Sequence, residues 1–281
     1  MRETKNLEFK ETVSNTFLKT VSAYSNYGTG KIEFGRKDDG SVVGIKDAQS
    51  TCLNIENMIN DSIKPAPDYS LSISEDNIII LTVKEGSYKP YFYKSKAYKR
   101  NDSATIEVDA LELTRLILEG QNKSYDSLAS SKNKLEFKIL GEKINSIMGV
   151  EKLTRDLLIT LELYTKDEGY TIAGELLADN NDFPGIDIVR FGKDINIFLD
   201  RAEFAGISIL RQYDKALEKY RQYYQYEVIE GSVRKMLEKI PERAFREAVA
   251  NALAHRTWDI KSNINISMFD DKIEIVSPGS L

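Results

Sequence analysis

Apolar residues recur at helical spacing in two N-terminal segments. The first covers residues 13–24 and stops at Gly28, and the second covers residues 53–63 and stops at two prolines. Residues 78–83, Ile-Ile-Ile-Leu-Thr-Val, form a short run of β-branched character, which favours a buried strand over a helix. Residues 109–120 begin with the capping-box pattern Asp-Ala-Leu-Glu and predict a third helix. Together these elements predict an α+β first domain.

Residues 26–45, between the first two helices, predict a β-hairpin. A glycine-containing loop leads into a short strand through Ile32 and Phe34, and Asp-Asp-Gly at 38–40 forms a tight turn. Residues 42–45, Val-Val-Gly-Ile, then predict the return strand. The hairpin places an acidic turn next to a glycine-rich loop.

The chain has 281 residues, which is enough for two or three hydrophobic cores. Residues 1–120 form the first predicted domain, and residues 121–133 are polar and rich in serine and lysine, which indicates a linker. Residues 134–235 predict a mixed, mostly helical middle region with strand-like patches within 186–199, and a winged-helix-like arrangement is an alternative. Residues 236–281 predict a final α/β segment.

Composition restricts the chemistry. The chain contains one cysteine and one histidine, so a Cys/His zinc site within one protomer is excluded and any metal must rest mainly on carboxylates, which favour Mg²⁺ or Mn²⁺. The sequence has no run of 18 or more apolar residues, and its N-terminus lacks the basic segment followed by an apolar segment that is typical of a signal peptide. We therefore expect a cytoplasmic protein with no membrane partner.

Positive charge is concentrated in one place although the net charge is −5. Between residues 84 and 100 the only acid is Glu85, and aromatic residues lie among the cations. Cations that neutralise phosphates beside rings that stack on bases favour single-stranded or distorted nucleic acid. The alternative is a solvated hairpin whose tyrosines pack on the sheet. The predicted nucleic-acid-binding residues are Lys89, Lys94, Lys96, Lys99 and Arg100.

Three segments, residues 3–10, 26–45 and 89–105, together resemble the Schlafen/AlbA-type domain over residues 1–120. In nucleases of this type, the resemblance implies two glutamates and a turn aspartate that hold a divalent metal, and a lysine that steadies the scissile phosphate. Other members resemble DNA-binding regulators. The implied metal ligands are Glu3, Glu8 and Asp38, and these three with Lys10 form the implied catalytic set.

Residues 241–256 predict an alanine-rich helix with a polar stripe. At 100° per residue, Glu247, Asn251 and His255 share one face, and the opposite face is apolar. The apolar residues are Phe245, Val249 and Leu253.

This helix and residues 264–279 resemble the first box of a GHKL-type ATPase in RecG-like bacterial regulators. The resemblance implies that Glu247 polarises water and that Asn251 holds magnesium. Because the chain stops at Leu281, before the glycine-rich boxes, we expect ATP binding only in a longer chain and no hydrolysis here. The alternative is an ordinary surface helix.

The sequence therefore predicts a homo-oligomeric nucleic-acid-binding protein, by its architecture an ATP-dependent transcriptional regulator. One alternative is a Mg²⁺- or Mn²⁺-dependent endonuclease that acts on structured RNA or DNA. Another is a nucleotide-sensing defence or toxin module that couples the two ends of the chain.

Overall fold

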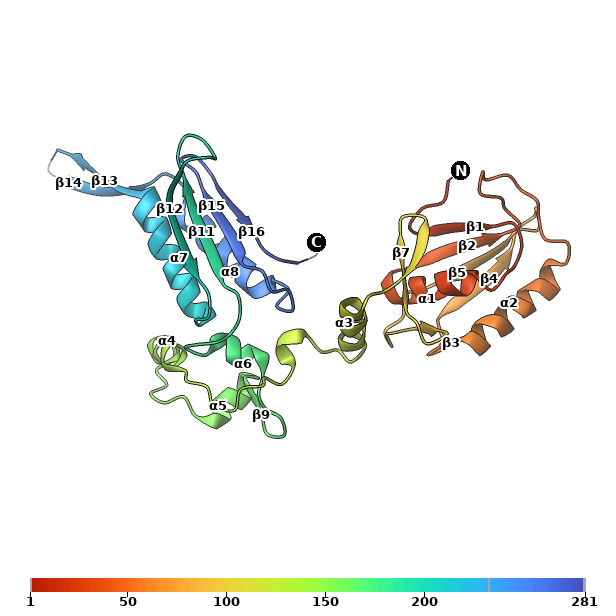
Figure 1. Cartoon of the computed structure of the whole chain (residues 1–281), viewed down its shortest axis with the longest axis horizontal. Coiled ribbons are helices and arrows are strands. Elements are labelled where there is room, and N and C mark those ends of the chain that lie inside the picture. The colour runs from red at the N-terminus through yellow and green to blue at the C-terminus, as the bar shows by residue number, and fades with distance from the viewer. Residues whose placement is uncertain (1, 232, 280–281) are drawn as a thin grey trace. The chain divides into compact units, whose positions relative to one another are not determined.

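The computed structural model describes residues 2–231 and 233–279. The chain is α+β and divides into two compact units, residues 1–124 and 125–281 (Figure 1). Each unit has its own hydrophobic core. No helix in the described part of the chain combines the length and the apolar character that crossing a lipid bilayer requires.

A four-stranded sheet in the order β1-β2-β5-β4 organises the first unit (Figure 1). β1 runs parallel to β2, and the other neighbours are antiparallel. Two short strand pairs, β3 with β6 and β7 with β8, complete the unit. The strands are β1 (Leu7–Lys10), β2 (Gly30–Phe34), β3 (Ile63–Lys64), β4 (Tyr69–Ile73), β5 (Ile79–Val83), β6 (Phe92–Tyr93), β7 (Tyr98–Asn101) and β8 (Ala104–Glu107). The helices are α1 (Phe17–Tyr27), α2 (Ala48–Ser62) and α3 (Ala110–Gly120).

The local predictions for this unit are confirmed in their main elements. α1 ends at Gly28, which has a φ of 129°, and its apolar face packs on the sheet, where Phe17 meets Phe34 edge to face with 5.2 Å between ring centroids. α3 begins with the predicted capping box, in which Asp109 and Glu112 each accept from the other's backbone N–H.

The predicted return strand of the hairpin at 42–45 is wrong. Only an isolated bridge joins Arg36 to Val42, and the sheet neighbours of β2 are β1 and β5. Gly35 has a positive φ, and its carbonyl accepts hydrogen bonds from the N–H groups of Val43 and Gly44 at 2.8 and 2.9 Å. The segment therefore folds back as a tight loop, and the apolar strand β5 occupies the sheet position instead.

The second unit is built around a sheet in the order β12-β11-β15-β16, in which β11 runs parallel to β15. Its helices are η1 (Tyr125–Ser127), α4 (Lys138–Met148), α5 (Arg155–Thr160), α6 (Ile172–Leu177), α7 (Ile209–Tyr224) and α8 (Glu242–His255). Its strands are β9 (Tyr164–Thr165), β10 (Gly169–Tyr170), β11 (Ile186–Phe191), β12 (Phe198–Phe204), β13 (Gln225–Glu230), β14 (Val233–Glu238), β15 (Ile264–Met268) and β16 (Ile273–Val276).

Two boundaries drawn from the sequence fall inside this unit. Tyr125 and Leu128, within the predicted linker 121–133, pack against a cluster that includes Trp258. The boundary predicted near residue 235 separates β11 from β15, yet these two strands pair with each other. Apolar residues of α7 and α8 pack together with residues of both strands in one core, so the middle and final segments fold as one body.

Candidate functional site

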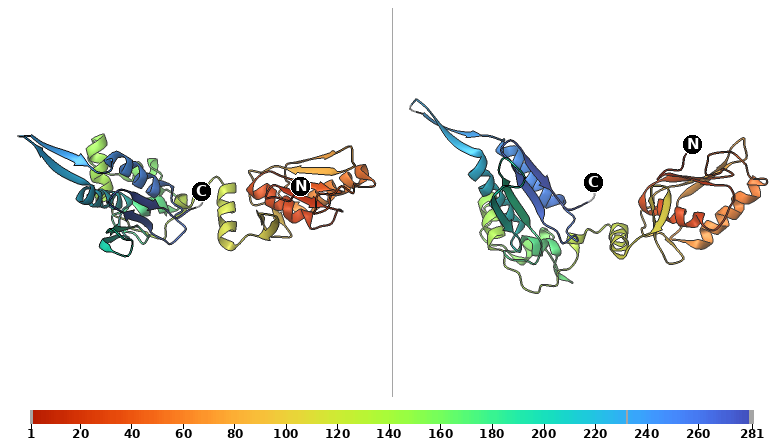
Figure 2. Two further views of the ribbon diagram at one scale, coloured as in Figure 1. Left: turned by 90° about the horizontal axis from the view of Figure 1, so that it is seen from above. Right: turned by 45° about the horizontal axis from the view of Figure 1, so that its top comes forward.

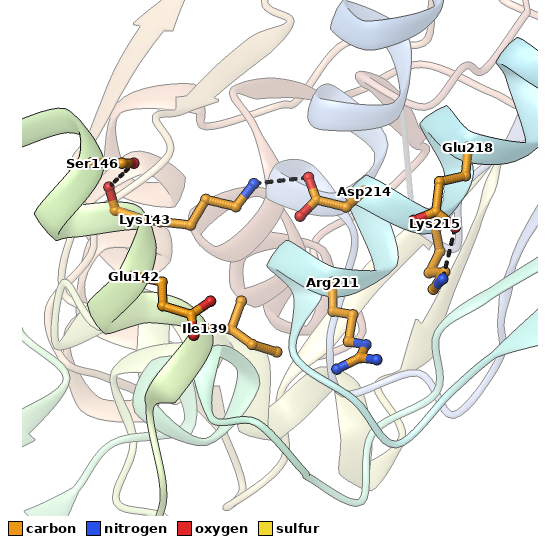
Figure 3. Close-up of a pocket in the computed structure, with 8 residues that line it drawn as sticks. All are labelled: Ile139, Glu142, Lys143, Ser146, Arg211, Asp214, Lys215 and Glu218. Carbon is orange, nitrogen blue, oxygen red and sulfur yellow. Dashed lines mark hydrogen bonds and ion pairs between the residues drawn. The ribbon is translucent and has the colours of Figure 1, made fainter.

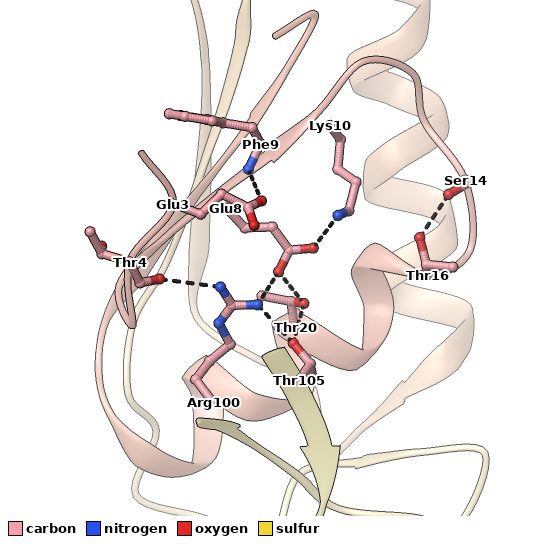
Figure 4. Close-up of polar contacts among 10 residues, drawn as sticks. All are labelled: Glu3, Thr4, Glu8, Phe9, Lys10, Ser14, Thr16, Thr20, Arg100 and Thr105. Carbon is pink, nitrogen blue, oxygen red and sulfur yellow. Dashed lines mark hydrogen bonds and ion pairs between the residues drawn. The ribbon is translucent and has the colours of Figure 1, made fainter. Parts of the chain in front are cut away.

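Glu8, one of the predicted metal ligands, is buried on β1 beneath α1. Its Oε2 atom accepts hydrogen bonds from Thr20 Oγ1 at 2.6 Å and from Arg100 Nη1 at 2.7 Å, and its Oε1 atom lies 2.7 Å from Lys10 Nζ (Figure 4). As predicted for alternate residues of a strand, Glu8 and Lys10 share one face. Both carboxylate oxygens are therefore engaged by protein cations and a hydroxyl.

Arg100, on β7, joins β1, β8 and the turn that precedes β1 at this point. Besides its bond to Glu8, its guanidinium donates to Thr105 Oγ1 at 3.0 Å and to the Thr4 carbonyl oxygen at 3.2 Å (Figure 4). Arg100 is 7% exposed, so it lies inside the unit rather than on the predicted surface. Burial raises the pKa of the nearby Tyr24, and the Arg100 charge opposes this shift. The geometry is that of a buried structural ion pair.

The structure does not bring the predicted carboxylate trio together. Glu3 Oε1 accepts the backbone N–H of Phe9 at 2.8 Å, so this side chain closes the N-terminal turn onto β1. Asp38 is exposed in the turn after β2. Among the described residues, no three acidic, histidine or cysteine side chains converge to hold a metal ion.

Most cations of the basic segment have carboxylate partners from other parts of the unit. Lys89 has only 5% of its side chain exposed and lies 2.6 Å from both Glu85 and Glu119. Lys96 lies 2.7 Å from Glu107, which raises the pKa of this lysine, and both side chains remain exposed. Lys99 is paired with Glu112. Lys94 is exposed, and its ammonium lies 5.4 Å from the ring centroid of Tyr93.

The aromatic residues of this segment mostly pack inside the unit, as the alternative interpretation proposed. Tyr91, Tyr93 and Tyr98 are buried in the first hydrophobic core, whereas Tyr88 is 75% exposed. The rings of Tyr93 and Tyr98 lie next to each other, with 6.4 Å between centroids. Of these four tyrosines, only Tyr88 presents a ring that could stack on a base.

Lys19 on α1 belongs to the same surface and was missed at the sequence level. Its ammonium lies 5.8 Å from the ring centroid of Tyr98, so Lys19 and Lys94 flank the tyrosine pair from two elements. The sequence contained one indication that Lys19 is exposed, because residue 19 is polar and lies on a helix whose apolar positions are 17, 21 and 24. We call Lys19, Lys94 and Lys96 the cationic patch.

Residues 3–109 match the sequence model of the Schlafen, AlbA_2 family. The matched residues make up most of the first unit, which we call the AlbA_2 domain after this match. This family suggests a nucleic-acid-binding domain. The AlbA_2 domain includes every residue proposed from the sequence for metal or nucleic-acid binding at the N-terminal end.

Two solved structures match nearly all or part of this chain with little shared sequence. The DIP2311 protein from Corynebacterium diphtheriae is 20% identical, with a TM-score of 0.48, and the alignment covers 99% of this chain and 61% of that protein. The N-terminal domain of a RecG-related protein from Nitrosomonas europaea is 16% identical, with a TM-score of 0.29, over 39% of this chain and 83% of that domain. This chain thus spans about three fifths of the Corynebacterium protein. No curated protein matches it.

In the second unit, Glu247 and Asn251 lie on the exposed face of α8, and Phe245, Val249 and Leu253 are buried, as the helical period predicts. Glu247 accepts a hydrogen bond from Arg243 Nε at 3.0 Å. An apolar groove of about 440 Å³ runs between α8 and β16, and its lining includes neither Glu247 nor Asn251. The ATPase roles of these two residues remain predictions.

A cleft of about 370 Å³ lies between α4 and α7 in the second unit. Lys143 lies 2.8 Å from Asp214, which joins the two helices (Figure 3). Three basic and three acidic side chains line this cleft, so its charge selects neither anions nor cations. The charged residues are Glu142, Lys143, Arg211, Asp214, Lys215 and Glu218.

Proposed function

We propose that the protein binds nucleic acid through its AlbA_2 domain, and that the cationic patch contacts the phosphate backbone. The observation that carries the proposal is the placement of Lys19 and Lys94 around one pair of tyrosines, in a domain whose family suggests nucleic-acid binding. Two cations that are held on neighbouring rings lose less freedom when they contact phosphates than two independent surface lysines would.

The turn that carries Lys94 supports this proposal. Tyr93 and Lys96 exchange backbone hydrogen bonds of 2.9 and 3.1 Å, and the two residues between them, Lys94 and Ser95, have φ values of 50° and 62°. Positive φ at both central positions is typical of a type I′ turn, for which Asn-Gly is preferred. A lysine at this position has an unfavourable backbone conformation. This strain has a functional reason if the lysine charge contributes to nucleic-acid binding.

The arrangement favours contacts to phosphate over recognition of bases. Tyr93 and Tyr98 are buried, so of these three tyrosines only Tyr88 has a ring exposed for stacking on a base. Lysine acts on phosphate as a point charge and reads no base sequence. We therefore expect binding with weak sequence preference and strong dependence on salt.

We also propose, as a finer hypothesis, that the protein is a transcriptional regulator that responds to ATP. Its support is the resemblance of α8 and the following strands to RecG-like regulators, together with the exposure of Glu247 and Asn251 on one helix face. Calorimetry with Mg²⁺ and ATP on a chain that contains the glycine-rich boxes tests it, because Asn251→Ala should abolish the heat of binding there. Binding that survives this substitution would contradict the assignment.

The nuclease alternative has less support from the AlbA_2 domain. Glu8 would have to leave both Lys10 and Arg100 before it could bind Mg²⁺ or Mn²⁺. Breaking one partner from a buried ion pair costs about 3–5 kcal/mol. We therefore propose binding rather than cleavage as the function of this domain.

Fluorescence anisotropy with labelled single-stranded DNA, duplex DNA and a hairpin RNA, each at several salt concentrations, tests the proposed function. Because each lost phosphate contact lowers the slope of log K against log salt by about 0.7–0.9, the double variant Lys19→Glu/Lys94→Glu should bind at least tenfold more weakly with a shallower slope. Lys31→Glu is the matched control, because Lys31 is exposed on β2 and alternates with the core residue Ile32. Unchanged binding by the double variant, or an equal loss in the control, would refute the patch.

A further inference from the structure

A two-stranded ribbon, β13 and β14, projects from the second unit between α7 and α8 (Figures 1 and 2). All six residues of β14 are exposed. An isolated ribbon of this kind is at best marginally stable in water and gains stability when further strands join it. Five large apolar side chains of the ribbon are exposed, namely Tyr226, Ile229, Val233, Met236 and Leu237.

The charges on β14 make this strand complementary to itself. In an antiparallel pair of two β14 strands centred on Met236, Arg234 of one copy lies opposite Glu238 of the other, and the same pair occurs twice by symmetry. Both residues are exposed, and unlike charges directly across two strands attract. Met236 then meets Met236 of the second copy at the two-fold axis.

Neighbouring registers are less favourable. A pair centred on Lys235 places two lysines opposite each other, and a pair centred on Leu237 places Lys235 opposite Lys239. Like charges directly opposite destabilise a strand pair. The charge pattern thus selects one register.

We propose that β14 pairs edge to edge with β14 of a second copy of the chain, antiparallel and centred on Met236. The two ribbons then form a four-stranded sheet in the order β13-β14-β14-β13. A nucleic acid is a poorer occupant of this surface, because the ribbon carries three glutamates, at 227, 230 and 238, against Arg234 and Lys235. The inference is independent of the proposed nucleic-acid binding.

A reciprocal charge exchange tests the register in the full chain. Sedimentation equilibrium should show a concentration-dependent dimer of the wild-type chain. Arg234→Glu should weaken dimerisation at least tenfold, because a glutamate at position 234 then lies opposite Glu238 of the second copy, and this like-charge pair occurs twice by symmetry. Arg234→Glu/Glu238→Arg should restore the dimer, because the unlike pairs return with their signs exchanged. A wild-type chain that stays monomeric, or an Arg234→Glu variant with unchanged association, would overturn the proposal.

Glu238 also accepts the backbone N–H of Glu242 at the start of α8, at 2.8 Å, so the double variant could lose stability. Cross-linking gives an independent answer. Directly opposed residues have Cβ atoms about 5 Å apart, so in a Cys52→Ser background Met236→Cys should form an interchain disulfide under mild oxidation. Ile229→Cys is the control, because two copies of this position would be separated by three strand spacings, about 14 Å, and by four residues along the strands, about 13 Å. Equal cross-linking at both positions, or none at 236, would overturn the register.

Discussion

At the scale of single residues, Glu8 determines how the N-terminal site should be interpreted. Its carboxylate binds Thr20, Lys10 and Arg100 at distances of 2.6–2.7 Å, and the Arg100 side chain is 4% exposed. A buried guanidinium without its counter-charge is costly, because little water replaces the lost partner. The glutamate implied as a metal ligand is therefore engaged on both oxygens by groups of the protein itself.

We predict that Glu8→Gln destabilises the AlbA_2 domain by about 3 kcal/mol, because Arg100 loses its charged partner while it remains buried. Urea denaturation without divalent metal measures the change. Asp38→Asn is the control and should alter the free energy of unfolding by less than about 0.5 kcal/mol, because Asp38 is exposed. A Glu8→Gln variant as stable as the wild type would return Glu8 to the set of candidate metal ligands.

At the scale of elements, α7 carries a stack of tyrosines into the core of the second unit. Tyr220 and Tyr224 lie with their rings stacked, 5.5 Å apart, and Phe245 of α8 stacks on Tyr220. The hydroxyl of Tyr220 donates to the Ile240 carbonyl, and that of Tyr224 donates to the Phe269 carbonyl. Burial raises the pKa of each tyrosine to about 12.

This packing predicts that the second unit loses stability in alkali. In the unfolded chain these tyrosines ionise near their ordinary pKa of 10.0, whereas the folded state keeps them neutral up to about 12. The stabilisation is therefore complete below pH 10 and is lost as the pH rises from about 10 to 12. Thermal melting followed by Trp258 fluorescence should show a falling Tm over this window. Tyr220→Phe should flatten the decline, and an unchanged pH profile in that variant would contradict the assignment.

At the scale of the whole molecule, the division into two units separates the proposed activities. The cationic patch, the Glu8–Arg100 pair and the first core belong to residues 1–124, and the ribbon and α8 belong to residues 125–281. Cys52 and all predicted carboxylate ligands also lie in the first unit. Nucleic-acid binding and dimerisation should therefore be separable by dissection of the chain.

We predict that a fragment of residues 1–124 folds alone and binds the same oligonucleotides within threefold of the affinity of a monomeric full-length chain. The reason is that its core is complete without the second unit. Circular dichroism should show one cooperative thermal transition, and anisotropy should report the affinity. A fragment that folds but binds more than tenfold more weakly would place phosphate contacts in the second unit.

The sequence by itself determined the features that depend on neighbours along the chain. The end of α1 at Gly28, the capping box of α3 and the opposite polar and apolar faces of α8 follow from helical period and local hydrogen bonding. The family resemblance likewise rested on local motifs, and the AlbA_2 match covers them.

Only the tertiary structure decided which charged residues are available. Glu8 and Arg100 are 92 positions apart and become partners because β1 and β7 meet beside α1, and Lys89 is enclosed by Glu119 of α3. The same long-range packing gave β2 the strand β5 as a neighbour in place of the predicted residues 42–45. Composition gives only the number of charged residues. Pairing across the fold determines which of these residues face solvent, because a buried charge is stable only beside its partner.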